Sequence, residues 1–259
     1  MADSNSNTVD EWAIELVPAN DAGRAFYLAE YKPFRLAALK QDPHAFGSTY
    51  AREAAFPDET WLERLSDPRI KMFVVVRRHD RRILSAVSLI GPMPHAGQLV
   101  ANPTQALLSQ TAPSGHGSTG RTTSTTSTTT ATTTTSTGHQ ESGEGREEEE
   151  KEGKEGDHHR QDKDAPLLYQ NASVYTRPEA RGRGLGLKLM ATAVECVRQE
   201  ARRQKRECRL GVEVYKTNHA AISFYKRCGF EATATEAPES EDDAKRPELC
   251  MYYKDFLQQ

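Results

Sequence analysis

The chain has 259 residues, of which 36% are hydrophobic and 27% are charged, and its net charge is −3. This length is enough for one large domain or two small ones, at the usual size of about 100–200 residues per domain. The nearly neutral charge argues against nucleic acid or a membrane as a partner of the whole chain.

The N-terminal residues 1–11 are polar and acidic, and we expect them to form a disordered tail. They contain no apolar region of the kind found in secretory signals. The longest apolar runs, 72–76 and 83–90, are too short to span a bilayer. These features predict a cytoplasmic protein, with the nucleus as the alternative, whose four cysteines stay reduced.

Two helices and two strands are predicted in the first part of the chain. The spacing of apolar residues predicts a helix around 24–40 and a second one over 57–67, where Asp58 or Thr60 is expected as the N-cap. Two strands should follow, at 71–78 and 83–91. The short polar link between these strands indicates an antiparallel hairpin.

Residues 101–165 are predicted to be a disordered insertion. Within it, residues 118–137 are almost entirely Ser and Thr, and residues 141–164 carry 11 acidic and 5 basic side chains, a net charge of −6. Such sequences bury too little apolar surface to offset the entropy of ordering them. The rest of the chain then has a charge of about +3, since −3 minus −6 is +3, which suits an anionic ligand. Residues 12–259 should form one domain that the insertion interrupts.

After the insertion, strands and helices alternate. A strand is expected at about 168–176, a long helix after residue 186, a strand at 209–215, a short helix that Gly229 ends, and a last strand within 247–257. The long helix should bury one face, made by Leu189, Met190, Ala193, Val194 and Val197. This mixed order of helices and strands predicts a single α/β or α+β domain.

The sequence RGRGLG, residues 181–186, has three glycines at alternate positions where the long helix begins. Glycines permit positive φ angles and a close approach of a ligand, and the unpaired N–H groups of a helix N-terminus attract phosphate. Arg181 and Arg183 add charge and bidentate hydrogen bonding. The turn predicts a phosphate or pyrophosphate site, with a flexible, solvent-facing turn as the alternative. Its spacing excludes the GxGxxG fingerprint and the P-loop.

The turn has a companion motif further along the chain. The pattern NxxAxxxYxxxGF is matched by Asn218, Ala221, Tyr225, Gly229 and Phe230, and the pattern Q/R-x-x-G-x-G/A by Arg181, Gly184 and Gly186. Together these motifs resemble the GNAT acetyltransferase superfamily, and residues 35–65 are similar to the N-terminal helical region of many of its small-molecule enzymes. The resemblance covers residues 12 to 98 and 167 to 257. It implies a single GNAT-type domain, with a mixed central sheet flanked by helices.

The resemblance also implies that acetyl-CoA is the co-substrate. Its pyrophosphate would bind to Arg181, Gly182, Arg183, Gly184, Leu185 and Gly186. The strand before the turn would pair with the pantetheine arm through Val174, Tyr175 and Thr176. The same strand is expected to splay away from the strand at 209–215, which opens a wedge where the thioester meets an amine.

Two residues of the companion motif each have two interpretations. Asn218 caps the short helix, and in the family the equivalent asparagine also hydrogen-bonds the cofactor arm. Tyr225 is either a core residue or, as the resemblance implies, the acid that protonates the leaving thiolate. A thiol pKa of about 8.5 and a phenol pKa of about 10 give this transfer little driving force, so positioning matters more.

The general base is less clearly indicated, because the strand at 168–176 contains no acidic residue. Glu213 and Glu53 are candidates, although each could equally be a surface or salt-bridging carboxylate, and ordered water could carry the proton instead. No cysteine lies in a motif that would carry an acetyl group, so direct transfer in a ternary complex is expected. No metal site is predicted, because no His or Cys has ligand spacing.

The sequence therefore predicts an N-acetyltransferase that moves the acetyl group of acetyl-CoA to a primary amine of a small molecule, as a monomer or homodimer. A protein N-terminal or lysine acetyltransferase is one alternative, and a non-catalytic acyl-CoA-binding module is another. Asn171 begins a glycosylation sequon that we interpret as accidental on a strand. Because the insertion joins two strands, we expect it beside the acceptor side of the domain.

Overall fold

The computed structural model describes residues 11–93, 99, 103–104, 165–233 and 248–256. The expected N-terminal tail and nearly all of the expected insertion, residues 1–10 and 105–164, lie outside these described residues. All described helices and strands belong to one unit of the chain.

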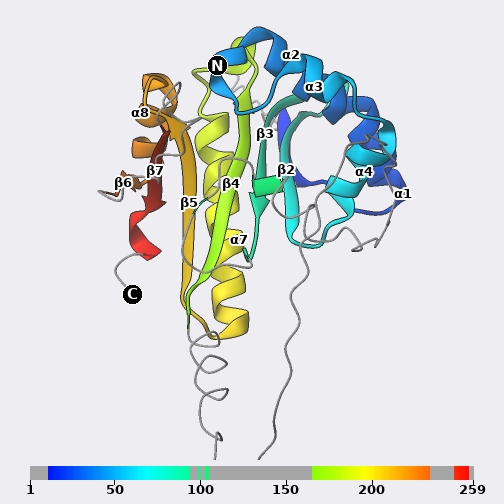
Figure 1. Cartoon of the computed structure of the whole chain (residues 1–259). Helices are drawn as coiled ribbons and strands as arrows, with labels where there is room; N and C mark the ends of the chain where they lie inside the picture. Colours follow the sequence, from blue (N-terminus) through cyan, green and yellow to red (C-terminus); the bar gives the residue numbers. More distant parts are fainter. Residues whose placement is uncertain (1–10, 94–98, 100–102, 105–164, 234–247, 257–259) are drawn as a thin grey trace, which may run out of the picture. The chain divides into compact units, whose positions relative to one another are not determined.

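The described strands form one seven-stranded sheet, in the order β1-β2-β3-β4-β5-β7-β6 (Figure 1). They are β1 (Trp12–Leu16), β2 (Ile70–Arg77), β3 (Ile83–Ile90), β4 (Leu167–Thr176), β5 (Cys208–Tyr215), β6 (Phe230–Ala232) and β7 (Glu248–Tyr253). β4 and β5 are parallel, and the other neighbouring pairs are antiparallel. The mixed sheet and the hairpin of β2 and β3 are as predicted, whereas β1 was not predicted.

Helices cover both faces of the sheet. One face carries α1 (Asp21–Phe26), the π-helix η1 (Tyr27–Tyr31), α2 (Lys32–Gln41), α3 (Tyr50–Ala54) and α4 (Asp58–Ser66), and the other carries α7 (Leu185–Gln204) and α8 (His219–Arg227). Short 3-10 helices are η2 (Pro43–Ala45), η3 (Pro178–Ala180) and η5 (Lys254–Phe256). Because α1, η1 and α2 follow one another without a gap, the helix expected at 24–40 is longer than predicted. The mixed sheet flanked by helices confirms the predicted fold class.

The predicted N-cap of α4 is wrong. Pro57 occupies the N-cap position, and no side chain caps the helix there. Asp58 lies inside the first turn, where its negative charge interacts favourably with the positive end of the helix dipole. It also accepts a hydrogen bond from Lys32 Nζ at 2.6 Å. Pro57 has the extended conformation of an N-cap residue, with φ of −64° and ψ of 162°, but offers no side-chain acceptor to the N–H groups of the first turn.

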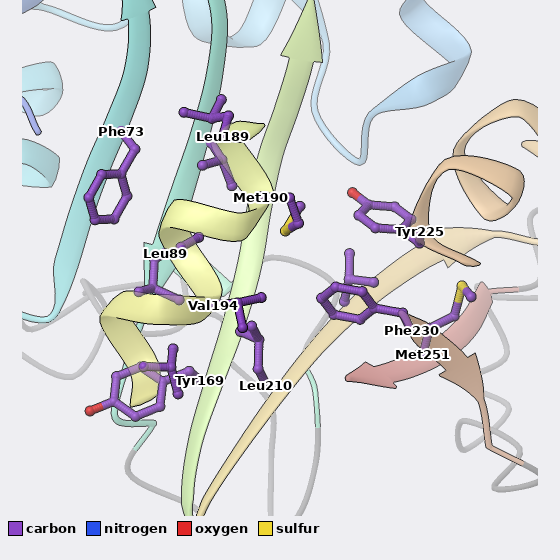
Figure 2. Packing of buried hydrophobic residues seen from close by; sticks show 14 of the residues in the cluster. Phe73, Leu89, Tyr169, Leu189, Met190, Val194, Leu210, Tyr225, Phe230 and Met251 are labelled. Carbon is purple, nitrogen blue, oxygen red and sulfur yellow. The ribbon is translucent and has the colours of Figure 1, made fainter. Parts of the chain in front are cut away.

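The core explains why α7 holds a fixed position. Residues of β2 alternate between two clusters, so that Phe73 and Val75 pack with α7 while Val74 and Val76 pack with α1 to α4. The face of α7 that the spacing predicted is buried, as Figure 2 shows for part of it: Leu189, Met190, Ala193, Val194 and Val197. Full burial of such larger apolar side chains stabilises by about 1.5–3 kcal/mol each. This packing fixes the start of α7, and with it the glycine turn.

β4 and β5 are paired only along their first halves. The pairing runs from Leu167 opposite Cys208 to Gln170 opposite Gly211. Beyond this point β4 remains paired with β3 and β5 with β7, so the two strands diverge (Figure 1). The splay expected from the sequence is therefore present. It releases backbone N–H and C=O groups of β4 from the sheet on the side of the wedge.

Candidate active site

The glycine turn before α7 has a backbone suited to an anion. Gly182 and Gly184 have φ angles of 75° and 73°, which residues with a side chain rarely adopt. A Cβ built on either glycine would meet no described atom within 4 Å, so the space in front of the turn is open. Gly184 is also the N-cap of α7, whose first N–H groups and dipole favour negative charge. The geometry fits a bound phosphate.

The two arginines of the turn are ion-paired with carboxylates. Arg181 donates from Nε to the Thr176 carbonyl at 3.0 Å and from Nη2 to Asp42 Oδ2 at 2.8 Å. Arg183 donates from Nη2 to Glu11 Oε2 at 2.7 Å. All four charged side chains are substantially exposed, and exposed ion pairs contribute only about 0–1 kcal/mol. Either guanidinium group can therefore turn toward a bound anion at small cost.

A cleft of about 600 Å³, which we call the turn cleft, follows the glycine turn and the end of β4. Nine of the ten residues predicted to bind the cofactor line it: Val174, Tyr175, Thr176, Arg181, Gly182, Gly184, Leu185, Gly186 and Asn218. Arg183 is the exception. Asp42 and Ala45 also line the turn cleft, and sequence reasoning did not connect them with the turn because they lie far away along the chain.

A bulge in β4 reverses the direction of its side chains at the turn cleft. Ser173 has a φ of 53°, and the pairing with β3 shifts by one residue in this region. An extra residue in one strand exchanges the faces on which the following side chains lie. Tyr169 packs with α7, and strict alternation would place Tyr175 on the same face. Instead Val174 packs on the α7 face and Tyr175 packs with α1 to α4.

A second cleft, of about 150 Å³, occupies the wedge between β4 and β5, and we call it the wedge cleft. Its walls come from segments far apart in the sequence: Arg35, residues 45–48, 103–104, 170–174 and 212–215, Asn218, Ala221, Tyr225 and Glu248. It shares Ala45, Val174, Asn218, Ala221 and Tyr225 with the turn cleft. The two clefts therefore meet at α8 and at the bulged part of β4.

Tyr225 lies where the two clefts meet. Its side chain is buried, and its ring lies near that of Phe230 (Figure 2). It packs edge-on against Phe224 and Phe230, with centroids 5.3 and 5.7 Å away. Burial, with a smaller effect of Cys228, raises the pKa of the Tyr225 phenol. The tyrosine thus belongs to the core and also faces the junction of the clefts, so the two interpretations of this residue are compatible.

Asn218 caps α8, as one interpretation held. Its Oδ1 accepts a hydrogen bond from the backbone N–H of Ala221 at 3.1 Å, which satisfies one of the free donors at the helix start. Asn218 also lines both clefts. The cap fixes the first turn of α8, and α8 in turn carries Tyr225.

The two carboxylates considered as bases have different surroundings. Glu213 lines the wedge cleft, and the thiol of Cys250 lies 3.9 Å from its Oε1. Glu53 is among the lining residues of neither cleft, and it pairs with Arg35 at 2.8 Å and with Arg64 at 3.6 Å. Burial alone would raise the pKa of Glu53, but the hydrogen bonds from Arg35 and the two positive charges hold it below its usual value. Glu53 is a salt-bridging carboxylate.

Asn171 is a wedge-cleft residue that sequence reasoning dismissed. It is 2% exposed, and its Nδ2 lies 3.1 Å from the sulfur of Met190. Its Oδ1 has no hydrogen-bond partner among the residues that the structure describes. The sequon at this position is therefore inaccessible within the folded sheet. The sequence signal that could have found this residue is the pair of adjacent amides, Gln170 and Asn171, within a predicted strand.

The comparisons with known proteins agree with this geometry. Residues 147–232 match the family model described as an Acetyltransferase (GNAT) domain, which includes β4, the turn, α7, β5 and α8. No curated protein matches the chain.

The chain is also similar to several solved structures. NAA60 from Arabidopsis thaliana in complex with acetyl-CoA is 11% identical, with a TM-score of 0.50, and the alignment covers 93% of this chain and 97% of that one. A ribosomal-protein-alanine N-acetyltransferase from Brucella melitensis is 16% identical, with a TM-score of 0.45 and coverage of 93% and 98%. A variant of the spermidine N-acetyltransferase SpeG from Vibrio cholerae is 12% identical, with a TM-score of 0.47 and coverage of 95% and 96%.

Proposed function

We propose that this chain, which carries a GNAT acetyltransferase domain, transfers the acetyl group of acetyl-CoA directly to a primary amine of a small molecule. One observation carries the proposal: a cleft along an anion-binding turn meets a second cleft at Tyr225. The first cleft fits the co-substrate, and the second gives an amine access to the same point.

GNAT acetyltransferases use acetyl-CoA, which supplies an acetyl group activated as a thioester. The turn fits its pyrophosphate, since Gly182 and Gly184 leave open space in front of the N-terminus of α7. We assign the pyrophosphate to the turn amides and to Arg181, and the pantetheine arm to the backbone of residues 174–176, which lies past the end of the β4–β5 pairing.

The reaction requires one proton donor and one proton acceptor near the junction of the clefts. The amine loses a proton as its nitrogen bonds to the acetyl carbon, and the sulfur gains one as the carbon–sulfur bond breaks. Tyr225 lines both clefts and stays protonated at neutral pH because burial raises its pKa, and we assign it to the departing sulfur on the ground of its position. Glu213, on the wall of the wedge cleft, is our candidate to accept the proton of the amine, directly or through water.

Mass spectrometry of acetylated products tests the proposed function. The full chain and Tyr225→Phe would be incubated in parallel with acetyl-CoA and a panel of amines, polyamines, amino acids and short peptides. We expect wild type to acetylate a small amine and Tyr225→Phe to give much less product. Product on peptides alone would replace the small-molecule acceptor. No product, from protein that binds acetyl-CoA in a calorimeter, would favour a non-catalytic acyl-CoA-binding module.

No helix among the described residues is both long enough and apolar enough to cross a membrane.

A further inference from the structure

The chain that leaves β3 does not turn directly back into β4. The backbone N–H of Met93 donates to the carbonyl of Leu168 at 2.8 Å, which ties the chain to the start of β4. Met93 is buried in a cluster with Ile70, Ile90 and Leu168. The described start of the β3–β4 connection is therefore attached to the sheet through both its backbone and its side chains.

Leu99 attaches the connection at a second place, over Gly211. A Cβ built on Gly211 would lie 2.5 to 3.0 Å from three side-chain atoms of Leu99, so Leu99 fills the space that any larger residue at 211 would occupy. Tyr252 is the β7 partner of Gly211 and hydrogen-bonds to the Leu99 backbone. Gly211 is also the last β5 residue paired with β4. Leu99 is thus seated at the apex of the wedge.

Pro103 and Thr104 follow shortly after this attachment and line the wedge cleft together with Gln170 and Glu213. Pro103 is buried and Thr104 is half-buried. Neither residue lines the turn cleft. These two described residues of the connection therefore lie at the cleft assigned to the amine and not at the cleft assigned to acetyl-CoA.

We propose that Pro103 and Thr104, on a connection that Met93 and Leu99 attach to the sheet, form a wall of the acceptor site and determine which amines reach Tyr225. This inference rests on the proposed function for the identity of the substrate. The attachment of Met93 and Leu99 to the sheet does not depend on the proposed function. A segment that only packed on the sheet would influence stability, whereas a wall residue changes the KM for the amine and leaves acetyl-CoA binding unchanged.

Alkylation of Cys250 tests the attachment without any substrate. Cys250 packs against the cluster that contains Leu99, and burial raises the pKa of its thiol to about 11, which slows its reaction with iodoacetamide. Leu99→Ala should raise the labelling rate of Cys250 several-fold, as measured by peptide mass spectrometry. Cys208, buried in the cluster around α7, is the internal control and should keep its rate. An unchanged Cys250 rate overturns the proposal.

Gly211→Ala supplies a matched pair of variants. The added methyl group should displace Leu99 and raise Cys250 labelling, and combining it with Leu99→Ala should remove the collision. We therefore expect the double variant to label no faster than Leu99→Ala alone. Labelling that rises additively would mean that the two residues are not in contact, which would also count against the attachment.

Thr104→Trp tests the effect on the amine. With an amine that the panel shows to be acetylated, this variant should raise the amine KM several-fold and leave the acetyl-CoA dissociation constant unchanged. An unchanged amine KM would mean that these residues pack on the sheet without shaping the acceptor site, and would overturn the proposal. If the panel gives no product, the proposed function and the claim about amines fall together, while Cys250 labelling still decides the attachment.

Discussion

Tyr225 belongs to the hydrophobic core and also lines both clefts. Its ring is part of the core, and burial raises the pKa of its phenol above the ordinary value of 10. The phenol therefore remains protonated at neutral pH, but it is also a weaker acid toward a thiolate of pKa about 8.5. The proposed acid role thus rests on the position of Tyr225 where the two clefts meet. Positioned acids contribute about 10²–10⁴-fold to a rate. We expect Tyr225→Phe to lower kcat by about 100-fold and to leave the acetyl-CoA dissociation constant nearly unchanged.

Tyr169→Phe is the matched control for this change. Tyr169 is another buried tyrosine of the same cluster, and burial raises its pKa as well, but it lines neither cleft. Its loss of a hydroxyl should leave kcat unchanged. The pH profile adds a second check, because the raised pKa predicts no loss of kcat through ionisation of Tyr225 below pH 10. A basic limb below pH 10 that disappears in Tyr225→Phe would contradict this assignment.

Gly184 tests the anion site at the scale of one residue. Its φ of 73° strains any side chain, so a substitution must separate strain from charge. Asp and Asn have the same shape and both tolerate this conformation better than most residues. We expect Gly184→Asp to weaken acetyl-CoA binding about 10-fold or more relative to Gly184→Asn, because a carboxylate would face the pyrophosphate. Isothermal titration calorimetry of both variants measures the difference, and equal affinities would remove the pyrophosphate from the turn.

At the scale of elements, one buried carboxylate connects three helices. Glu53 of α3 pairs with Arg35 of α2 and with Arg64 of α4. Removing one partner of a buried ion pair leaves the other charge uncompensated and costs about 3–5 kcal/mol. We expect Glu53→Gln to lower the free energy of unfolding by about this amount in urea titrations. The exposed Glu63 of α4 provides the control, since Glu63→Gln should change stability by less than about 0.5 kcal/mol.

The same pair predicts a pH dependence of stability. The pKa of Glu53 in the folded chain lies below its ordinary value of 4.5, so the folded state binds this proton less readily than the unfolded state. The contribution of the pair is therefore complete above about pH 4.5 and is lost as the pH falls through the folded pKa. Glu53→Gln should flatten the fall in stability below pH 4.5. An equally steep fall in the variant would assign the dependence to other carboxylates.

The bulge in β4 leads to a prediction for the stability of variants at Ser173. Ser173 has a positive φ, and an L-residue in this region is strained by about 1–2 kcal/mol, while glycine is not. Ser173→Gly should therefore keep or raise the melting temperature, and the β-branched Ser173→Val should lower it. Because the bulge directs Val174 and Tyr175, Ser173→Val should also weaken acetyl-CoA binding. Weaker binding in both variants would point to the serine hydroxyl instead of the backbone.

Local patterns predicted most elements, and their failures have local causes. The apolar spacing of α7 was sufficient because five of its residues meet one cluster. β1 was missed because it has only five residues and directly follows a polar tail. The bulge gave no signal in the sequence, because its residue with a positive φ is Ser173 and not the glycine that usually marks such a position. The N-cap expected for α4 was wrong because the helix already begins at Asp58, directly after Pro57.

At the scale of the whole molecule, the two clefts differ in how far the sequence predicts them. The turn cleft depends largely on motifs after the insertion, so nine of the ten residues predicted for the cofactor line it. The wedge cleft is assembled from Arg35 and from residues 45–48, 103–104, 170–174 and 212–215, among others, which only the folded sheet brings together. Pro103 and Thr104 have no motif around them, and no local pattern could identify them. The lining of the turn cleft is thus largely predictable from the sequence, while that of the wedge cleft is not.

This division leads to a prediction for the segment 105–164. All seven strands of the sheet, and every residue assigned here to the turn cleft, lie outside it. We therefore expect its replacement by a Gly/Ser linker about one fifth as long to preserve acetyl-CoA binding. The entropy of loop closure changes by about 0.6 kcal/mol for each doubling of length, so the shorter connection should stabilise the fold by about 1 kcal/mol.

Calorimetry with acetyl-CoA and urea unfolding of the shortened chain would measure both effects. A linker that begins directly after residue 104 leaves Leu99, Pro103 and Thr104 in place. The amine KM should therefore also be preserved if these residues are the wall of the acceptor site. A changed amine KM with unchanged acetyl-CoA binding would extend the acceptor site into 105–164. Lost acetyl-CoA binding in a folded variant would mean that the deleted residues contribute to the turn cleft, and that the domain is not merely interrupted by them.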